Sequence, residues 1–225
     1  DKDLLVANGY PKDLTDKDWT NFKAETWNFV ASEDQLINKA PAVKVPNIAF
    51  ENESDLKFVM KSDEWLNAPP SYSYGAAFAD LDNDGDLDYV VNNINDKAFV
   101  FKNTTIEKNK ENSNYLRIKL KGKPGNPFAF GAKVECWSQG TYQFQEHFLS
   151  RGYISSVDPI VHFGLHNLSR VDSVKVTWPA SGYVSVMKDI PVNQVIEIDE
   201  ETGVPPTNSG YKHLPPVYLL SLIHI

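Results

Sequence analysis

Residues 13–40 carry apolar side chains at the three- and four-residue spacing of amphipathic helices. The positions that carry this pattern are Trp19, Phe22, Thr26, Trp27 and Val30. Thr15, followed three positions later by Asp18, is typical of a helix N-cap. Because proline interrupts helices, Pro41 and Pro46 end the pattern. We therefore predict one or two helices in residues 13–40.

From Asn47 onward the period of the apolar pattern changes to two, which is typical of strands. The predicted strands of this region are 48–50, 56–59, 75–78, 89–91 and 98–101. Turn-forming residues separate them at intervals of roughly ten residues, as in all-β proteins. A polar stretch rich in Lys, Glu and Asn, residues 104–113, follows and is predicted to be a linker.

Residues 114–198 again alternate between apolar and polar positions, so this part is predicted to be built of antiparallel sheets with one solvated face. The predicted strands are 115–120, 132–137, 142–148, 160–163, 171–178, 184–186 and 194–198. Seven short strands in so few residues favour a β-sandwich or a small barrel. The predicted fold class is all-β. Its parts are residues 1–112, with the short helical insert, and a β-sandwich-like domain in 113–200.

Both ends of the chain read as incomplete or atypical. Residues 1–10 begin inside a strand-forming unit without a signal peptide, so the chain is interpreted as a fragment. Residues 201–225 are interpreted as linker and tail, because a polar, Pro-rich stretch precedes the apolar run 217–225. The apolar run fits a last strand or docking tail. Alternatively, residues 221–225 resemble a translated sequencing-adapter remnant, and no function is assigned to them.

Composition and charge exclude several classes of protein. The 225 residues are 41% apolar and 23% charged, and no apolar run approaches the length of a membrane-spanning helix. The net charge is −8, from 30 acidic and 22 basic side chains, which argues against a nucleic-acid partner. A single cysteine, Cys136, excludes an intrachain disulfide and the usual cysteine-based zinc sites.

The acidic excess lies in the first half, where one segment is especially rich in aspartate. Residues 1–112 contain 21 acidic and 12 basic side chains, whereas residues 113–225 contain 9 and 10. Within 80–88, five aspartates occupy alternate positions of nine residues. Carboxylates this close repel one another, and a hard divalent cation such as Ca²⁺ relieves the repulsion.

We predict a calcium site formed by these five aspartates. The side-chain ligands are expected to be Asp80, Asp82, Asp84 and Asp88, with the backbone carbonyl of Asp86 completing the set. An isolated, solvated acidic turn without metal is the plainer alternative.

The residues between the aspartates indicate what kind of loop this is. Gly85, at the sixth position, permits a sharp turn, and Leu81 and Leu87 are expected to anchor the loop inward. An EF-hand would need a bidentate Glu at the twelfth position, which here is Val91, and flanking helices. The loop is therefore not an EF-hand.

The segment 74–93, with its Asp-x-Asp-x-Asp-Gly-x-x-Asp core, resembles the FG-GAP or VCBS repeat. The resemblance implies a blade of an integrin-type β-propeller, with calcium held between two strands. Residues 1–10 resemble the tail of a preceding repeat, in which Asp1 and Asp3 take the seventh and ninth loop positions. An incomplete propeller is implied, with the missing blades of the parent chain as its partner.

The second half resembles the ASPIC/UnbV domain that follows such repeats in the cartilage acidic protein family. The matching stretches are 114–116, 130–134, 151–156, 158–159, 161–165, 171–179 and 191–194. The resemblance implies an architecture and no particular reaction. The stretch 151–156 is expected to shape a loop and its packing, and a polar ligand contact there stays open.

Two further sets of residues are candidates for a zinc site and for a hydrolase triad. His162 and His166 are four apart on a predicted strand, which separates them by roughly 13 Å and argues against one shared zinc ion. A hydrolase triad could be drawn from Ser155, Ser156, Asp158 and His162, but no G-x-S-x-G turn surrounds these residues.

The tryptophans of the insert region, Trp19, Trp27 and Trp65, allow two interpretations. They can form a sugar-stacking platform, or they can pack in an amphipathic core, which is the preferred interpretation.

The predicted function is a non-enzymatic, calcium-stabilised binding or adhesion module that is secreted or on the cell surface. Its partner would be a protein or a surface glycan. The location follows from calcium affinity, because extracellular modules bind Ca²⁺ at roughly 10⁻⁴–10⁻³ M, above cytosolic concentrations. The alternatives are a fragment of a calcium-dependent polysaccharide-processing enzyme, a glycan-binding protein, or a folded spacer.

Overall fold

The computed structural model describes residues 2–9, 11–26 and 32–206 of the chain. Asp1, Trp27, Val30 and the apolar tail, on which some predictions fall, lie outside these ranges. Strands predominate over short helices, as the all-β prediction requires. In the described ranges, no helix combines the length and the apolar character needed to cross a membrane.

In the first half of the chain, the described residues form six strands and four short helices. The strands are β1 (Leu4–Val6), β2 (Ile48–Asn52), β3 (Phe58–Met60), β4 (Ser73–Ala79), β5 (Asp88–Asn93) and β6 (Phe99–Phe101). The helices are α1 (Lys17–Thr26), α2 (Glu33–Lys39), α3 (Ser62–Trp65) and α4 (Thr105–Lys108).

In the second half, the described part of the chain, up to residue 206, forms seven strands followed by a short 3₁₀ turn, η2 (Glu200–Thr202). The strands are β7 (Asn114–Lys121), β8 (Lys133–Ser138), β9 (Thr141–Glu146), β10 (Ile160–His166), β11 (Arg170–Thr177), β12 (Val184–Pro191) and β13 (Gln194–Asp199).

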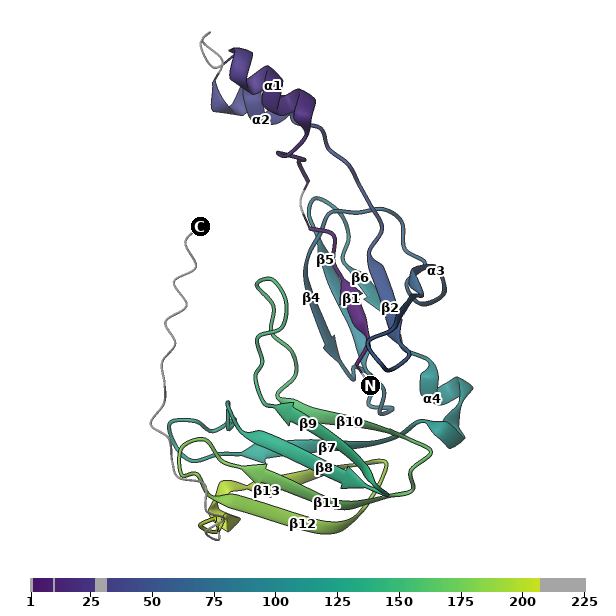
Figure 1. The fold of residues 1–225 in the computed structure, drawn as a ribbon, viewed down its shortest axis with the longest axis vertical. Coiled ribbons are helices and arrows are strands. Elements are labelled where there is room, and N and C mark those ends of the chain that lie inside the picture. The colour runs from purple at the N-terminus through teal and green to yellow at the C-terminus, as the bar shows by residue number, and fades with distance from the viewer. Residues whose placement is uncertain (1, 10, 27–31, 207–225) are drawn as a thin grey trace.

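The helical insert projects from the sheets at the end of the molecule away from the second domain (Figure 1). Asp16, not the predicted Thr15, caps α1, because its Oδ1 accepts a hydrogen bond of 2.7 Å from the backbone N of Trp19. The Thr15 hydroxyl and amide instead donate to Asp13. The Trp19 indole donates to the Leu36 carbonyl of α2 at 3.0 Å, so Trp19 packs between the helices.

The first domain consists of two three-stranded antiparallel sheets, β1-β2-β3 and β4-β5-β6. Strand β3 starts at Phe58, later than predicted, because Leu56 lies in a turn with φ of 62°. The buried core between the sheets is small and contains Ala49, Leu66, Tyr89 and Val91. Neither sheet closes on itself, and neither has a fourth strand among the described residues.

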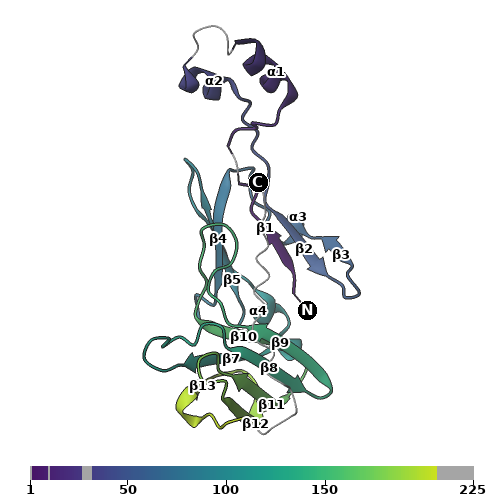
Figure 2. The same cartoon turned by 60° about the vertical axis from the view of Figure 1, so that its left-hand side comes forward.

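The second domain has two sheets packed face to face, with strand orders β10-β7-β13 and β12-β11-β8-β9 (Figure 2). Their inward side chains form one core of sixteen buried residues that includes Trp178 and Phe163. This arrangement of two sheets is consistent with the all-β prediction. One pairing differs from the prediction: β13 runs parallel to β7, because the chain crosses over from β12 in the other sheet.

The predicted linker contains helical structure. Helix α4 and a 3₁₀ turn, η1 (Lys110–Asn112), occupy most of it. The backbone N atoms of Asn103 and Ile106 donate to carboxylates of the acidic loop, at 2.8 and 3.0 Å. The segment is thus tied to that loop and does not run free between the domains.

The buried core of the second domain should dominate its stability. Phe163→Ala removes a ring that is fully buried, so we expect a loss of about 3–5 kcal/mol in the free energy of unfolding. Phe148→Ala, at a side chain 44% exposed, is the matched control and should cost less than about 1 kcal/mol. Urea unfolding followed by tryptophan fluorescence measures both, and equal losses would contradict the packing described here.

Candidate metal centre

The acidic loop connects β4 to β5 and is folded by its own carboxylates. Asp80 Oδ1 accepts a hydrogen bond from the backbone N of Asp84, and Asp80 Oδ2 accepts one from that of Gly85, both at 3.1 Å. Asp84 Oδ1 accepts from the backbone N of Asp86, also at 3.1 Å. The side chains of Asp80 and Asp84 therefore turn inward, because both accept hydrogen bonds from backbone amides further along the loop.

Three of the predicted ligands converge. Asp80, Asp82 and Asp84 each offer a carboxylate oxygen, and these oxygens lie within 4.8 Å of one another. A second group at the same spacing consists of Asp84, Asp86 and Glu107, and Glu107 belongs to α4. All these donors are oxygens, which suits a hard cation such as Ca²⁺ or Mg²⁺.

Two carboxylate oxygens in this cluster are buried without a hydrogen-bond partner among the described residues. They are Asp86 Oδ1 and Asp84 Oδ2, and the latter has an ion-pair contact of 3.9 Å with Lys102 Nζ. Burial raises the pKa of Asp86 to about 6, although a hydrogen bond from Ile106 opposes the shift. Because buried polar atoms are normally satisfied, orphaned anionic oxygens fit a loop that takes up a cation.

Asp88 lies beside this cluster and does not join either group. Its Oδ1 accepts from the backbone N of Asn103 at 2.8 Å, and its Oδ2 accepts from that of Leu81 at 3.0 Å. Asp88 thus fastens the start of the loop to the end of β6. Ligation by the Asp88 side chain and by the Asp86 carbonyl stays a prediction.

The prediction that Leu81 anchors the loop inward is wrong. Its side chain is 53% exposed, and the residue serves the loop through its backbone N. Leu87 is partly buried, and its carbonyl accepts from the Asn103 side chain at 3.3 Å. The loop is therefore anchored by hydrogen bonds of Leu81 N and of the Leu87 carbonyl, and not by apolar side chains.

One lysine supplies positive charge at the rim of the cluster. Lys102 Nζ lies 2.6 Å from Asp82 Oδ2 and 2.6 Å from Glu107 Oε1. These hydrogen bonds raise the pKa of Lys102 and lower the pKa values of Asp82 and Glu107. A divalent cation at this cluster must therefore compete with the Lys102 ammonium for Asp82.

The second domain contacts the loop through a buried arginine. Arg117 of β7 places its Nη1 2.6 Å from Asp80 Oδ2, and its Nη2 lies 3.3 Å from Asp158 Oδ2. The Arg117 and Asp80 side chains are 7% and 0% exposed. Removing one partner of such a buried pair leaves an uncompensated charge, so the pair joins the two domains strongly once both are folded.

A histidine and a tyrosine of the second domain enclose the turn of the loop. His162 Nε2 lies 2.9 Å from the Gly85 carbonyl, and the imidazole stacks on Tyr115 with ring centroids 6.0 Å apart. Burial lowers the pKa of His162, so the neutral ring donates its Nε2–H to the carbonyl. Gly85 has φ of 106°, and a Cβ there would lie 1.9 Å from the Tyr115 ring.

The candidate triad residues Ser155, Asp158 and His162 all make structural contacts. Ser155 Oγ accepts from the backbone N of Ala76 at 3.0 Å and donates to the Tyr153 carbonyl at 2.8 Å. Asp158 contacts Arg117, and His162 contacts Gly85. The stretch 151–156 thus packs a loop against β4, as expected from its sequence.

Sequence reasoning did not find Arg117, Lys102 or Glu107. Arg117 falls on the polar phase of β7, where alternation predicts solvent exposure. It is buried only because the loop of the other domain covers it. Glu107 and Lys102 lie in or beside a segment whose composition is that of a linker, so no local signal marked them.

Comparisons with known proteins found two sequence similarities. Residues 122–205 match the family model described as ASPIC and UnbV. The chain is also 30% identical, over 152 residues, to cartilage acidic protein 1 of Xenopus tropicalis. That alignment covers 62% of this chain and 22% of the relative, so the chain spans about a fifth of the relative's length. The ASPIC and UnbV region starts directly after β7, which carries Arg117.

The close contact at Gly85 gives a matched pair of substitutions. Gly85→Ala and Gly125→Ala both place a Cβ at a φ near 100°, but only the Gly85 Cβ meets another residue, Tyr115. Both should lose about 1–3 kcal/mol of stability to backbone strain, and Gly85→Ala should lose about 1–3 kcal/mol more to the collision. Chemical unfolding measures the difference, and equal losses would contradict the docking of the loop on Tyr115.

The raised pKa of Asp86 predicts how the stability of the metal-free protein depends on pH. Its folded pKa of about 6 exceeds its ordinary 3.8, so the folded state binds a proton more tightly and ionised Asp86 destabilises it. In chelator, Asp86→Asn should therefore raise stability by about 1–3 kcal/mol at pH 7.5, and this advantage should shrink toward pH 4.5. Denaturation midpoints of wild type and Asp86→Asn across this pH range test the prediction. A stability difference that does not change with pH would contradict it.

Proposed function

We propose that this chain is part of a calcium-stabilised, non-enzymatic binding module whose metal loop joins two β domains. The observation that carries the proposal is the convergence of the Asp80, Asp82 and Asp84 carboxylates, in a cluster where two buried carboxylate oxygens accept no hydrogen bond from the described residues. When bound, the ion supplies positive charge to this cluster. The residues do the rest: the aspartates offer oxygens, and Arg117 holds Asp80 in place.

The donor set and the folding of the loop favour calcium over magnesium. Magnesium requires near-ideal octahedral geometry, whereas calcium accepts six to eight oxygens in irregular arrangements. Here Asp80 is already fixed by Arg117 and two amides, and Asp84 is fixed by one amide. A site with partly committed carboxylates cannot rearrange freely, which suits the more tolerant ion.

The net charge of the region supports the need for a divalent ion. Asp80, Asp82, Asp84, Asp86, Asp88 and Glu107 surround the loop, and two cations, Lys102 and Arg117, contact them directly. The remaining negative charge weakens the folded loop. A bound calcium ion would reduce that charge and favour the docked arrangement.

The location and partner class follow from these features together with the relative. The relative is a cartilage acidic protein, and a weak calcium site fills only at extracellular concentrations. We propose a secreted or cell-surface protein in which the three-stranded sheets belong to blades of an FG-GAP/VCBS-type propeller. The remaining blades, and a protein or surface glycan, are its proposed partners.

Thermal melts of the chain in calcium, magnesium and chelator test the metal site. A ligand that binds only the folded state stabilises it by RT ln(1 + [L]/Kd), about 2.7 kcal/mol at a hundredfold excess over Kd. Calcium should raise the melting temperature by several degrees and magnesium by less. Asp82→Ala should abolish the calcium response.

The control is Asp18→Ala, which removes an aspartate of α1 far from the loop and should retain the full calcium response. If neither cation raises the melting temperature of the wild type, the calcium site is excluded. Lys102 is then the group that neutralises the loop carboxylates. If Asp82→Ala responds like wild type, the ion binds elsewhere.

A further inference from the structure

A second group of carboxylates lies where helix α4 packs against the acidic loop, at the junction of the two domains (Figure 1). It contains Asp84 and Asp86 of the loop and Glu107 of α4, and their oxygens lie within 4.8 Å of one another. The backbone N of Ile106 donates to Asp86 Oδ2 at 3.0 Å. Because Glu107 is the next residue, this hydrogen bond brings its carboxylate close to the two aspartates.

The Asp86 side chain indicates that this group takes up a ligand. Asp86 is 7% exposed, and its Oδ1 accepts no hydrogen bond from the described residues. Buried carboxylate oxygens are normally satisfied by hydrogen-bond donors or by a cation. In the metal-free protein, the neighbours of this oxygen are instead the carboxylates of Asp84 and Glu107, which repel it.

The Lys102 ammonium contacts part of this group only. Its Nζ lies 2.6 Å from Glu107 Oε1 and 3.9 Å from Asp84 Oδ2. It lies as close as 2.6 Å to Asp82 Oδ2, so it is shared with the first carboxylate group, that of Asp80, Asp82 and Asp84. None of these contacts is with Asp86. One shared ammonium therefore leaves the second group with an excess of negative charge.

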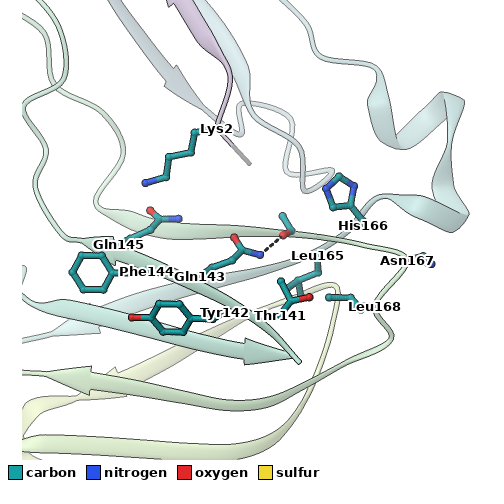
Figure 3. A pocket seen from close by; sticks show the side chains of 11 residues that line it. Lys2, Thr141, Tyr142, Gln143, Phe144, Gln145, Leu165, His166, Asn167 and Leu168 are labelled. Atoms are coloured by element: carbon teal, nitrogen blue, oxygen red, sulfur yellow. Dashed lines mark hydrogen bonds between the residues drawn. The ribbon is translucent and has the colours of Figure 1, made fainter. Parts of the chain in front are cut away.

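The open groove of the second domain offers no comparable donors for a cation. It has a volume of about 380 Å³ and lies along β9 and β10 (Figure 3). The described residues that line it include no aspartate or glutamate, and they include the cation Lys2. The carboxylates at the junction of the loop and α4 are therefore the better place for a further metal ion.

We propose that Asp84, Asp86 and Glu107 bind a second calcium ion, next to the ion proposed for the first carboxylate group. Asp84 belongs to both groups, and its two carboxylate oxygens can serve both ions. Through Glu107, the second ion would hold α4 on the loop. Calcium suits this group better than magnesium, because Asp86 is buried away from water and magnesium gives up its own water ligands reluctantly.

The proposal rests on the calcium-binding function proposed above and adds a second ion to it. The two sites can fail separately, because Asp82 belongs only to the first group, whereas Asp86 and Glu107 belong only to the second. Two arrangements compete with the proposal. A single ion can be held by both groups together, or Lys102 alone can balance the carboxylates of the second group.

Equilibrium dialysis of the full chain against radioactive calcium counts the bound ions. Wild type should bind two calcium ions per chain at about 10 mM free calcium, since extracellular modules bind calcium with a Kd of at most roughly 10⁻³ M. Glu107→Gln and Asp86→Asn should each bind one ion, because each removes a charged ligand of the second group alone. Asp82→Ala should also bind one ion, because it removes a ligand of the first group.

The matched control is Glu111→Gln, the same substitution at an exposed position of η1 that belongs to neither group. This variant should bind two ions. Asp86→Asn separates ligand loss from other effects, because it is expected to be more stable than wild type in chelator and because Lys102 does not contact Asp86. Circular dichroism of each variant in chelator verifies that it is folded.

The contradicting results are distinct. A single ion in wild type that Asp82→Ala removes and Glu107→Gln retains overturns the second site and leaves the proposed function intact. A single ion that Glu107→Gln and Asp86→Asn remove and Asp82→Ala retains supports the second site and contradicts the first. A single ion that all three variants remove indicates one shared site and overturns the proposal. Absence of bound calcium in wild type overturns both sites.

Discussion

The ion pair between Asp80 and Arg117 is the contact on which the arrangement of this molecule depends. It lies at the point where the acidic loop of one domain meets the second domain, and both side chains are almost fully buried. A buried charge is tolerated only when it is compensated. The loop can therefore fold as observed only while β7 is docked against it, and without the loop Arg117 would keep only its longer contact with Asp158.

This dependence matters because the two domains have unequal cores. The second domain buries sixteen apolar residues in one cluster, whereas the first buries four between two three-stranded sheets. The first domain therefore draws much of its order from polar contacts around the loop, including those of His162 and of Asn103. A cation bound in the loop would stabilise these polar contacts and so compensate for the small apolar core. This is the structural role of the proposed calcium site.

Local patterns predicted most of the elements but few of the contacts between them. Strand alternation located β7 and β11 well, and the aspartate spacing located the loop, because these signals lie within a few residues. The parallel pairing of β13 with β7 depends on a crossover between sheets, which alternation does not report. Arg117 has the sequence environment of an exposed strand residue, and only the docking of a distant loop makes it part of the site.

A crystal structure of the chain grown in calcium chloride would test the central claim most directly. The account predicts an ion bound by oxygens of Asp80, Asp82 and Asp84 at about 2.3–2.6 Å, with the Lys102 ammonium moved away from Asp82. Arg117 should keep its contact with Asp80. An unchanged contact between Lys102 and Asp82, with no ion among the three carboxylates at millimolar calcium, would contradict it.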